Sequence, residues 1–229
     1  MALLEAFQAD VTISRLLSKM SDETTSHKLT GTEARAVGVA RERGIARTSD
    51  FDAAGVPRAY LKRLCDEGLL VRHGRGLYQL ADAELSAAHS LAEIARAVPR
   101  GTVCLLSALL FHELTTRLPH AVWLMLDSKD WAPRNPPVMT EIVRASGESL
   151  TAGIQRHSIE GVHVPVTAIA KSVADCFKYR NRVSLDVAME ALRDCLRYRR
   201  ASVDDIMRFA RICRVENVMR PYVEAMVLR

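Results

Sequence analysis

The chain has 229 residues, of which 48% are apolar and 5% are aromatic, and its formal net charge is +5. This composition excludes a disordered tail, because so many apolar side chains provide surface to bury on folding. A membrane span is not expected either, since the longest apolar run, Val103 to Phe111, has about nine residues where a span needs roughly 20. With no secretory signal pattern, the sequence predicts a cytoplasmic protein of one large domain or two small ones.

The five cysteines are an odd number and include no CxxC pair. This usage predicts reduced, mostly buried thiols and argues against both a disulfide scaffold and a zinc site. The cysteines are Cys65, Cys104, Cys176, Cys195 and Cys213. We accordingly expect no bound metal and no cofactor.

Arginine makes up 26 of the 32 basic side chains. Its planar guanidinium suits phosphates and guanine edges, although a GC-rich genome also raises the arginine content, so the count alone decides nothing. The distribution of the charged side chains along the chain is more informative. Residues 28–80 carry ten basic and six acidic side chains, a net charge of +4, and residues 181–229 carry ten and seven, a net charge of +3. Positive charge therefore gathers in an N-terminal block and in the C-terminal part.

Residues 1–27 form an N-terminal extension. They hold one amphipathic stretch, Leu3 to Leu17, followed by a polar run from Ser18 to Lys28. Two interpretations stay open for this extension: a helical arm, or a flexible segment.

Three helices are predicted within residues 28–80. Thr30 and Glu33 are spaced as a capping box for a helix that ends at Gly44. A second helix is expected to begin at Thr48 or Ser49, with Asp52 three residues after Ser49, and to end near Gly55. Pro57 stands at the expected start of a third helix, which ends at Gly68.

A β-hairpin is predicted directly after these helices. Leu69–Arg72 and Leu77–Leu80 are short extended segments, joined by His73-Gly74-Arg75-Gly76. Three helices followed by a hairpin, within about 50 residues, are the order of a winged helix-turn-helix. We therefore predict that residues 28–80 form a winged helix-turn-helix domain.

A second domain is predicted over residues 81–229. Asp82 is expected to cap a helix that runs to Ala97, and the apolar segment Val103–Leu114 is expected to form a buried helix. Short alternating segments divided by Pro and Gly predict strands over about 121–166. Apolar spacing of three and four residues predicts helices over about 167–228, with start signals at Ser184 and Ser202.

The predicted fold class is therefore α+β. A winged helix-turn-helix is followed by a mixed α/β domain that ends in a helical region.

The third helix of the winged helix carries the first candidate site. Its apolar residues fall on one face, and the opposite face presents Arg58, Lys62 and Arg63. A helix-turn-helix offers that face to the major groove, where arginine bonds guanine bidentately and lysine meets a base or a phosphate. Tyr60 lies at the edge between the two faces, and packing is the simpler interpretation for it.

The hairpin tip carries the second candidate site. Arg72, His73 and Arg75 flank two glycines, so the backbone can approach a surface while the side chains reach phosphates or a minor groove. A plain solvated turn is the alternative. Two basic elements at the places where a winged helix touches DNA favour DNA binding.

Several runs of residues form a pattern that extends from the winged helix into the second domain. They are Arg43–Asp50, Ala54–Arg58, Tyr60–Leu61, Gly68–Leu70, Gly74–Tyr78, Val103–Leu109, Leu118–His120, Val122–Trp123 and Ala170–Arg180. The pattern resembles the AbiEi antitoxins, the antitoxin partners in AbiE abortive-infection systems, which are grouped as type IV toxin–antitoxin modules. The resemblance covers roughly residues 38–200, and Ala170–Arg180 is its most specific run.

This resemblance implies two functions and no enzymatic activity. The winged helix binds inverted repeats in the promoter of its own operon and represses it, and the C-terminal antitoxin domain neutralises a nucleotidyltransferase-like toxin without needing a stable complex. Inverted repeats require two copies on the DNA, about one helical turn or a multiple of it apart, but no dimer in solution. The residues carried over for DNA contact are Arg58, Tyr60, Lys62, Arg63, Arg72 and Arg75.

Two alternatives stay open. Asp127 and Glu141 with Arg144 resemble the acidic pair and cation of a metal-dependent nuclease, although arginine stands where lysine is expected. The other alternative is a winged-helix repressor whose C-terminal domain senses a small molecule.

The C-terminal arginines give one further candidate surface. Arg197, Arg200 and Arg208 recur on two predicted helices and the turn between them. A solvated face paired with nearby carboxylates is the simpler interpretation. The alternative is an antitoxin surface that meets an RNA target or the acidic patch of a toxin.

Overall fold

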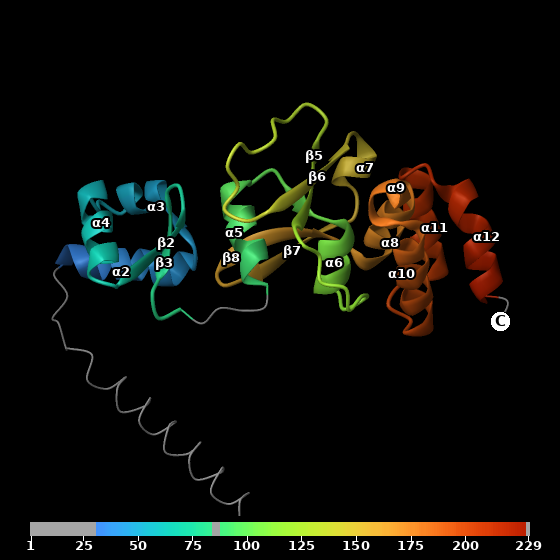
Figure 1. Cartoon of the computed structure of the whole chain (residues 1–229), viewed down its shortest axis with the longest axis horizontal. Coiled ribbons are helices and arrows are strands. Elements are labelled where there is room, and N and C mark those ends of the chain that lie inside the picture. The colour runs from blue at the N-terminus through green and yellow to red at the C-terminus, as the bar shows by residue number, and fades with distance from the viewer. Residues whose placement is uncertain (1–30, 84–87, 228–229) are drawn as a thin grey trace, which may run out of the picture. The chain divides into compact units, whose positions relative to one another are not determined.

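The structure is a computed structural model that describes residues 31–83 and 88–227 (Figure 1). By its contacts the chain divides into two units, Met1–Ala34 and Arg35–Arg229. The expected N-terminal extension and the cap residue Thr30 lie outside the described residues. Helices and strands alternate irregularly along the chain, which confirms the α+β class.

The first group of elements is three helices and a small sheet. The helices are α2 (Gly31–Arg43), α3 (Thr48–Ala53) and α4 (Arg58–Asp66). The strands β1 (Ala46–Arg47), β2 (Leu70–Gly74) and β3 (Leu77–Leu80) form an antiparallel sheet in the order β1-β3-β2. These elements confirm the expected helices and hairpin. β1 was not expected, because two residues are too short for an alternating pattern.

The helix ends follow the local signals with one correction. Gly44 and Gly68 follow α2 and α4 closely and have φ angles of +62° and +74°, which favour glycine. α3 begins at Thr48, one of the two expected starts, so the spacing of Ser49 and Asp52 is not used for capping. The Asp50 carboxylate instead accepts a hydrogen bond from the backbone N–H of Arg47, at 2.7 Å.

The core of this group is made by all three helices and by β2. Phe51, Leu61 and Leu64 are at most 1% exposed, and Leu70 is buried beside them. Tyr78 meets Phe51 edge to face, with 5.8 Å between the ring centroids. Burial of one face of α4 against this core leaves its other face exposed to solvent.

A five-stranded mixed sheet organises the next part of the chain. Its strand order is β6-β5-β4-β8-β7. The strands are β4 (Thr102–Val103), β5 (Val122–Asp127), β6 (Thr140–Ala145), β7 (Ile154–Ile159) and β8 (Val162–Thr167). The strands expected over about 121–166 are confirmed by β5, β6, β7 and β8. β4 is central but only two residues long, and it runs antiparallel to β5 and parallel to β8.

Two expected helices are shorter than the sequence indicated. Asp82 does not cap a helix; it lies in a turn after β3, and α5 (His89–Ala97) begins only at His89. The apolar segment that starts at Val103 divides into the end of β4 and α6 (Leu105–Phe111), because Val103 pairs with strands on both sides. A short helix, α7 (Glu148–Thr151), follows β6.

The helical end of the chain matches the expected spacing. Its helices are α8 (Ile169–Lys178), α9 (Arg180–Val183), α10 (Leu185–Arg197), α11 (Val203–Ile212) and α12 (Glu216–Val227). Both expected start signals are confirmed: the Ser184 hydroxyl accepts from the N–H of Val187 at 3.4 Å, and Ser202 from that of Asp205 at 3.0 Å. The four cysteines after Cys65 are buried, and all five thiols are free.

Helix α8 is the buried centre of this region, and it carries two charges. Lys171 and Asp175 are both 0% exposed, and the ammonium contacts both carboxylate oxygens at 2.5 Å. Burial raises the pKa of Asp175, and the positive charge of Lys171 opposes that shift. The Cys213 thiol donates a further hydrogen bond to this carboxylate, at 3.3 Å.

Residues of the first group also pack directly against the sheet and α5. Ile45 and Leu77 belong to one buried cluster with Leu91, Ile94 and Val164. Beside this cluster the backbone at Gly44 approaches the backbone at Glu160 closely. A side-chain carbon at Gly44 would collide with the carbonyl oxygen of Glu160, so only glycine fits there.

An ion pair and a hydrogen bond also join the first group of elements to the sheet and α5. Arg96 of α5 pairs with Asp50, and the Gln79 amide donates to Glu160 at 3.2 Å.

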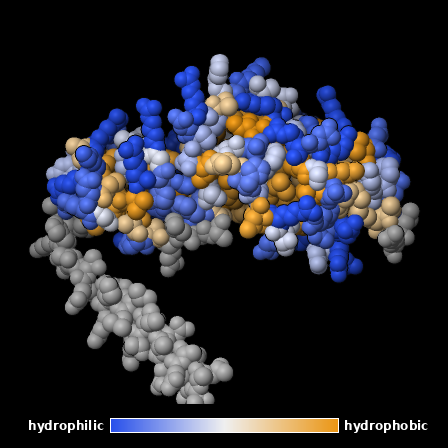
Figure 2. All heavy atoms as spheres, in the orientation of Figure 1, coloured by the Kyte–Doolittle hydropathy of each residue, from blue (hydrophilic) through white to orange (hydrophobic). Residues whose placement is uncertain are grey.

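Among the described residues, none of the helices has both the length and the apolar character that a membrane crossing requires. Figure 2 shows that the face in view is largely hydrophilic, with apolar patches interrupted by charged side chains.

Candidate nucleic-acid interface

Helix α4 has two chemically distinct faces. Leu61 and Leu64 are 1% and 0% exposed on the core side. Arg58, Lys62 and Arg63 are all exposed on the other side, where the sequence predicted them. Because α4 packs against β2, the cations of α4 and those of the wing hairpin belong to neighbouring elements. The arrangement offers donors for phosphate oxygens and for guanine edges.

Arg58 at the start of α4 has a carboxylate partner. Its guanidinium lies 2.8 Å from Asp52 of α3, and its side chain is 74% exposed. The hydrogen bond from Arg58 lowers the pKa of the Asp52 carboxyl below its ordinary value. Asp52 was not expected in the site, because it lies six residues away across the turn at Gly55, a spacing that gives no local signal. The pair holds the guanidinium over the α3–α4 turn.

Arg63 and Tyr60 form a second exposed group on α4. The Arg63 guanidinium lies 2.7 Å from Glu67, one helical turn later, and its central carbon lies 5.1 Å from the centroid of the Tyr60 ring. Tyr60 is partly buried against the winged-helix core, as the packing interpretation had it. Lys62 lies between these groups and is exposed.

The wing turn presents two further cations. Arg72 and Arg75 are exposed, and Arg72 donates to the backbone carbonyl of Gly74 at 3.0 Å. The pairing of β2 with β3 shifts register between Arg72 and Gly74. Such an irregularity twists a hairpin tip and turns its side chains.

His73 does not share this exposed surface. Its side chain is 17% exposed, and Nδ1 lies 3.2 Å from the Glu93 carboxylate of α5. The structure thus separates His73 from Arg72 and Arg75, because neighbouring strand residues point to opposite faces of the hairpin.

The three C-terminal arginines have different surroundings. Arg200 donates to the backbone carbonyl of His112 at 2.9 Å and so ties the end of α10 to the end of α6. Arg208 pairs with Asp205 at 3.0 Å and is 58% exposed. Arg197 is exposed, 5.5 Å from the Tyr198 ring centroid. Of the three, Arg208 is the one that pairs with a carboxylate among the described residues.

The three residues of the nuclease alternative do not form one site. Asp127 pairs in register with Ala145, whereas Glu141 lies opposite Trp123, four residues away along the strands, or about 13 Å. Arg144 donates to the backbone carbonyls of Asp127 and Asp130, at 2.8 and 2.6 Å. Glu141 pairs with Arg182 at 2.7 Å. The carboxylates are therefore too far apart to hold one Mg²⁺ ion.

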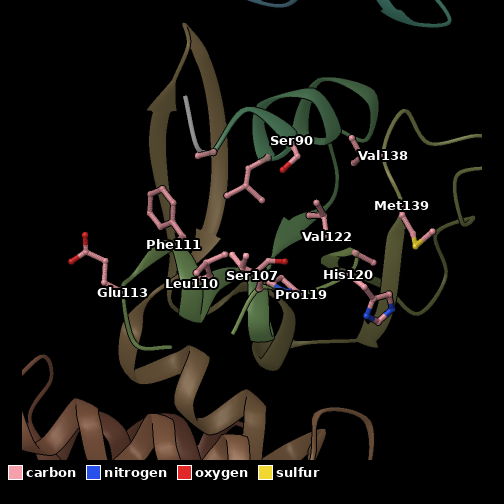
Figure 3. Close-up of a pocket in the computed structure, with 14 residues that line it drawn as sticks. Ser90, Ser107, Leu110, Phe111, Glu113, Pro119, His120, Val122, Val138 and Met139 are labelled. Atoms are coloured by element: carbon pink, nitrogen blue, oxygen red, sulfur yellow. The ribbon is translucent and has the colours of Figure 1, made fainter. Parts of the chain in front are cut away.

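A cavity of about 810 Å³ lies beside α5 and α6 (Figure 3). This volume falls within the roughly 300–1,000 Å³ of small-molecule sites. Leu110, Phe111 and Val122 give it an apolar wall. The Ser107 hydroxyl accepts a hydrogen bond from the Trp123 N–H, at 3.0 Å, so it is already engaged within the fold. The cavity suits an apolar occupant better than a charged one.

Comparisons with known proteins bear on the fold and on the first part of the chain. No curated protein matches it. The crystal structure of the RV2827C protein from Mycobacterium tuberculosis is similar, with a TM-score of 0.56 and 14% sequence identity, covering 86% of this chain and 82% of that chain. At this identity the likeness concerns the fold alone. Residues 29–81, the winged-helix part, match the family model described as "Transcriptional regulator, AbiEi antitoxin".

Proposed function

We propose that this chain is a type IV antitoxin that represses its own operon. In this proposal residues 28–80 bind inverted repeats in the promoter as a winged helix-turn-helix domain, with α4 in the major groove and the wing turn along the flanking backbone. Residues 81–229 counteract a nucleotidyltransferase-like toxin. The match of residues 29–81 to the antitoxin regulator family supports both roles.

The observation that carries the DNA-binding role is the exposed cationic face of α4. Arg58, Lys62 and Arg63 project from a helix that buries Leu61 and Leu64 on its other face, and Arg72 and Arg75 add exposed positive charge on the wing. Arginine and lysine at these places supply both base recognition and neutralisation of phosphates. Asp52 competes for Arg58 in the free protein, so a base that replaces Asp52 must offer comparable acceptors.

Titration of the full chain with its own promoter DNA tests this role. Fluorescence anisotropy is expected to show tighter binding to the promoter than to a shuffled duplex of the same length, with two chains bound per inverted repeat. Equal affinity for both duplexes would contradict a specific repressor.

The toxin-directed role is tested by growth rescue. Co-expression with the product of a neighbouring nucleotidyltransferase-like gene is expected to restore growth, with or without a complex that survives purification. For the antitoxin surface, we infer that Arg197 and Arg208 contribute directly and that Arg200 contributes through its bond to the His112 carbonyl.

Charge reversal separates that surface from the DNA-binding face. Arg197→Glu with Arg208→Glu is expected to abolish rescue and to leave promoter affinity unchanged. Arg220→Glu is the matched control, because Arg220 is an exposed arginine of α12 that pairs with Glu216 at 2.8 Å. If the double variant rescues growth as well as the control does, Arg197 and Arg208 are not part of the antitoxin surface.

The cavity beside α6 supports a second candidate function, a repressor that senses an apolar small molecule. Leu110→Trp is expected to fill the cavity. If the cavity is a sensor site, the variant binds promoter DNA with altered affinity and no longer responds to apolar ligands. If residues 81–229 act on a toxin, the variant keeps its promoter affinity.

A further inference from the structure

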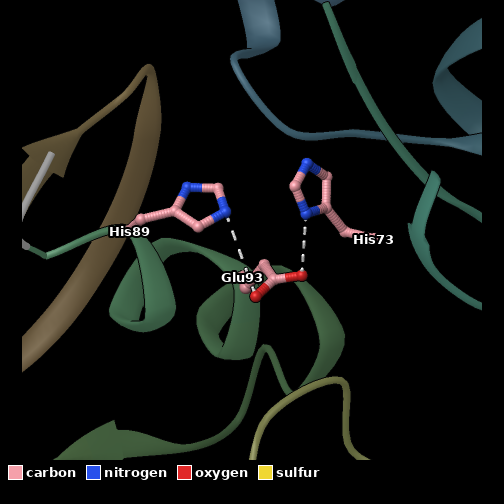
Figure 4. A group of neighbouring side chains, drawn as sticks. All are labelled: His73, His89 and Glu93. Carbon is pink, nitrogen blue, oxygen red and sulfur yellow. Dashed lines mark ion pairs between the residues drawn. The ribbon is translucent and has the colours of Figure 1, made fainter. Parts of the chain in front are cut away.

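Three potential metal ligands converge where the wing meets α5 (Figure 4). His73 comes from β2, and His89 and Glu93 come from successive turns of α5. Nδ1 of His73 lies 3.2 Å from one oxygen of Glu93, and Nε2 of His89 lies 4.0 Å from the other. One ligand atom from each residue lies within 4.8 Å of the others. The side chains are 17%, 17% and 9% exposed.

The hydrogen bonds of His89 determine which ring nitrogen is free to bind a ligand. Its Nδ1 lies 2.7 Å from a carboxylate oxygen of Glu160. A carboxylate in this position accepts the hydrogen bond, so Nδ1 is the donor and Nε2 is the ring nitrogen left to bind a ligand. Gln79 donates to the same oxygen of Glu160 at 3.2 Å and helps to fix its position.

The Nε2 atom of His89 is buried and has no hydrogen-bond partner among the described residues. It points toward Glu93 in Figure 4. Leaving a buried acceptor without a partner is unfavourable, because its contact with water is lost without compensation. This atom is therefore an independent sign that a ligand completes the group.

The donor set selects the chemical class of that ligand. Two imidazole nitrogens and one carboxylate are the protein ligands of Zn²⁺ sites that keep a fourth position for water. Bond lengths of about 2.0–2.2 Å place tetrahedral ligands roughly 3.3 Å apart, so the present separations of 3.2 and 4.0 Å need only small side-chain rotations. Metal-bound histidines commonly donate their other N–H to a carboxylate, as His89 does to Glu160.

We propose that His73, His89 and Glu93 bind one divalent transition-metal ion of the Zn²⁺ class, with Glu160 positioning His89. The ion joins the wing hairpin to α5, two elements otherwise held by packing and ion pairs. No metal was expected from the sequence, because its cysteines include no CxxC pair. His73 lies sixteen residues before His89, a separation that gives no local signal. The His89–Glu93 spacing of four residues, one helical turn, was the available signal.

Cobalt and zinc binding to the full chain test the proposal. The protein is purified without a histidine tag, treated with a chelator and titrated with Co²⁺, whose visible absorption reports tetrahedral coordination by protein ligands. Saturation at one ion per chain is expected, followed by displacement of Co²⁺ by Zn²⁺. Zn²⁺ is also expected to raise the melting temperature of the metal-free protein, because it binds only the folded state's assembled site.

Variants show whether these residues are the ligands. His73→Gln and His89→Gln are each expected to lower Zn²⁺ affinity at least tenfold, and Glu160→Gln to lower it by about 10–100-fold through the orientation of His89. His163→Gln is the control, because His163 is an exposed histidine of β8 outside the group. Its affinity for Zn²⁺ is expected to equal that of the unmodified chain.

Two results would overturn the site: no saturable Co²⁺ or Zn²⁺ binding by the folded chain, or equal affinity in the His73→Gln variant and the control. In either case His73 and Glu93 form only an ion pair. Circular dichroism of the metal-free variants shows whether they are folded, and His73→Gln on the wing is the informative variant if His89→Gln unfolds. Promoter binding of the metal-free chain is measured separately, so failure of this site leaves the DNA-binding proposal standing.

Discussion

Arg58 on α4 and Lys171 on α8 are both helical cations paired with a nearby aspartate, but the two pairs differ in their exposure to solvent. The Arg58–Asp52 pair is exposed, with side chains 74% and 39% accessible, whereas Lys171 and Asp175 are both 0% accessible. An exposed pair exchanges easily for another acceptor such as a phosphate, because water already screens it. A buried pair has no such exchange partner. A pair of a cation and an aspartate is thus exchangeable on the surface of the winged helix and a fixed part of the core in the helical region.

The largest expected effect comes from breaking the buried pair. Lys171→Met leaves the Asp175 carboxylate without its cation, and the free energy of unfolding is expected to fall by about 3–5 kcal/mol. Urea denaturation followed by circular dichroism measures it. Since burial raises the pKa of Asp175, the variant is expected to lose less stability at low pH, where this carboxyl is protonated.

The double variant Lys171→Met with Asp175→Leu sharpens this test. Replacing both charges by apolar groups is often neutral or stabilising, so most of the lost stability is expected to return. A single variant that loses less than about 1 kcal/mol would show that this pair behaves like a surface pair.

Removing Arg58 is expected to affect DNA binding and not the fold. If Arg58 reads a guanine, Arg58→Ala weakens promoter binding by roughly 5- to 150-fold and reduces discrimination against shuffled DNA. Anisotropy titrations with both duplexes measure the two effects. An equal loss on promoter and shuffled DNA would show that Arg58 contacts phosphate only.

His112, at the end of α6, is expected to make the stability of the protein depend on pH. Burial lowers the pKa of His112 below its ordinary value, so the folded protein keeps this ring neutral. The unfolded chain takes up a proton as the pH falls through about 6.5, and the free energy of unfolding is expected to decrease below that pH. Urea unfolding from pH 7.5 to 5.5 measures the decrease. If the dependence is as steep in His112→Gln, it arises from another group.

The salt dependence of DNA binding is expected to show whether the wing contacts DNA phosphates. Arg75→Ala is expected to weaken binding to promoter and shuffled DNA alike and to reduce the slope of log affinity against log salt by about one. Titrations at three or more salt concentrations give the slope. An unchanged slope would place Arg75 away from the DNA.

The smallest effect is expected at the second exposed pair of α4. Arg63→Met removes the ion pair with Glu67 and is expected to change the free energy of unfolding by only about 0.3–0.5 kcal/mol. The same urea measurement, compared with Lys171→Met, gives the contrast directly. A loss above about 2 kcal/mol would mean that exposure does not separate the two kinds of pair.

Local signals in the sequence were enough to predict most helices. Gly44, Gly68, Ser184 and Ser202 act within one or two residues of the ends that they determine, so their effect needs no knowledge of the fold. The exposed face of α4 was predictable for the same reason, because helical spacing alone separates Arg58 from Leu61.

Contacts between distant segments were not predictable in this way. β1 and β4 have two residues each, and they are strands only because neighbouring strands pair with them. Asp52 reaches Arg58 across a turn, and His73 meets Glu93 only after β2 packs on α5. The burial of Lys171 has no local signal either, because it depends on the helices packed around α8.

The cluster that Ile45 and Leu77 share with Leu91, Ile94 and Val164 has a practical consequence. A fragment ending at residue 83 would retain the cationic face of α4 but would uncover Ile45 and Leu77, creating an apolar patch prone to self-association. Work with the isolated DNA-binding part therefore calls for polar replacements at these two positions. In the full chain, any displacement of α5 would also disturb the packing beneath the hairpin.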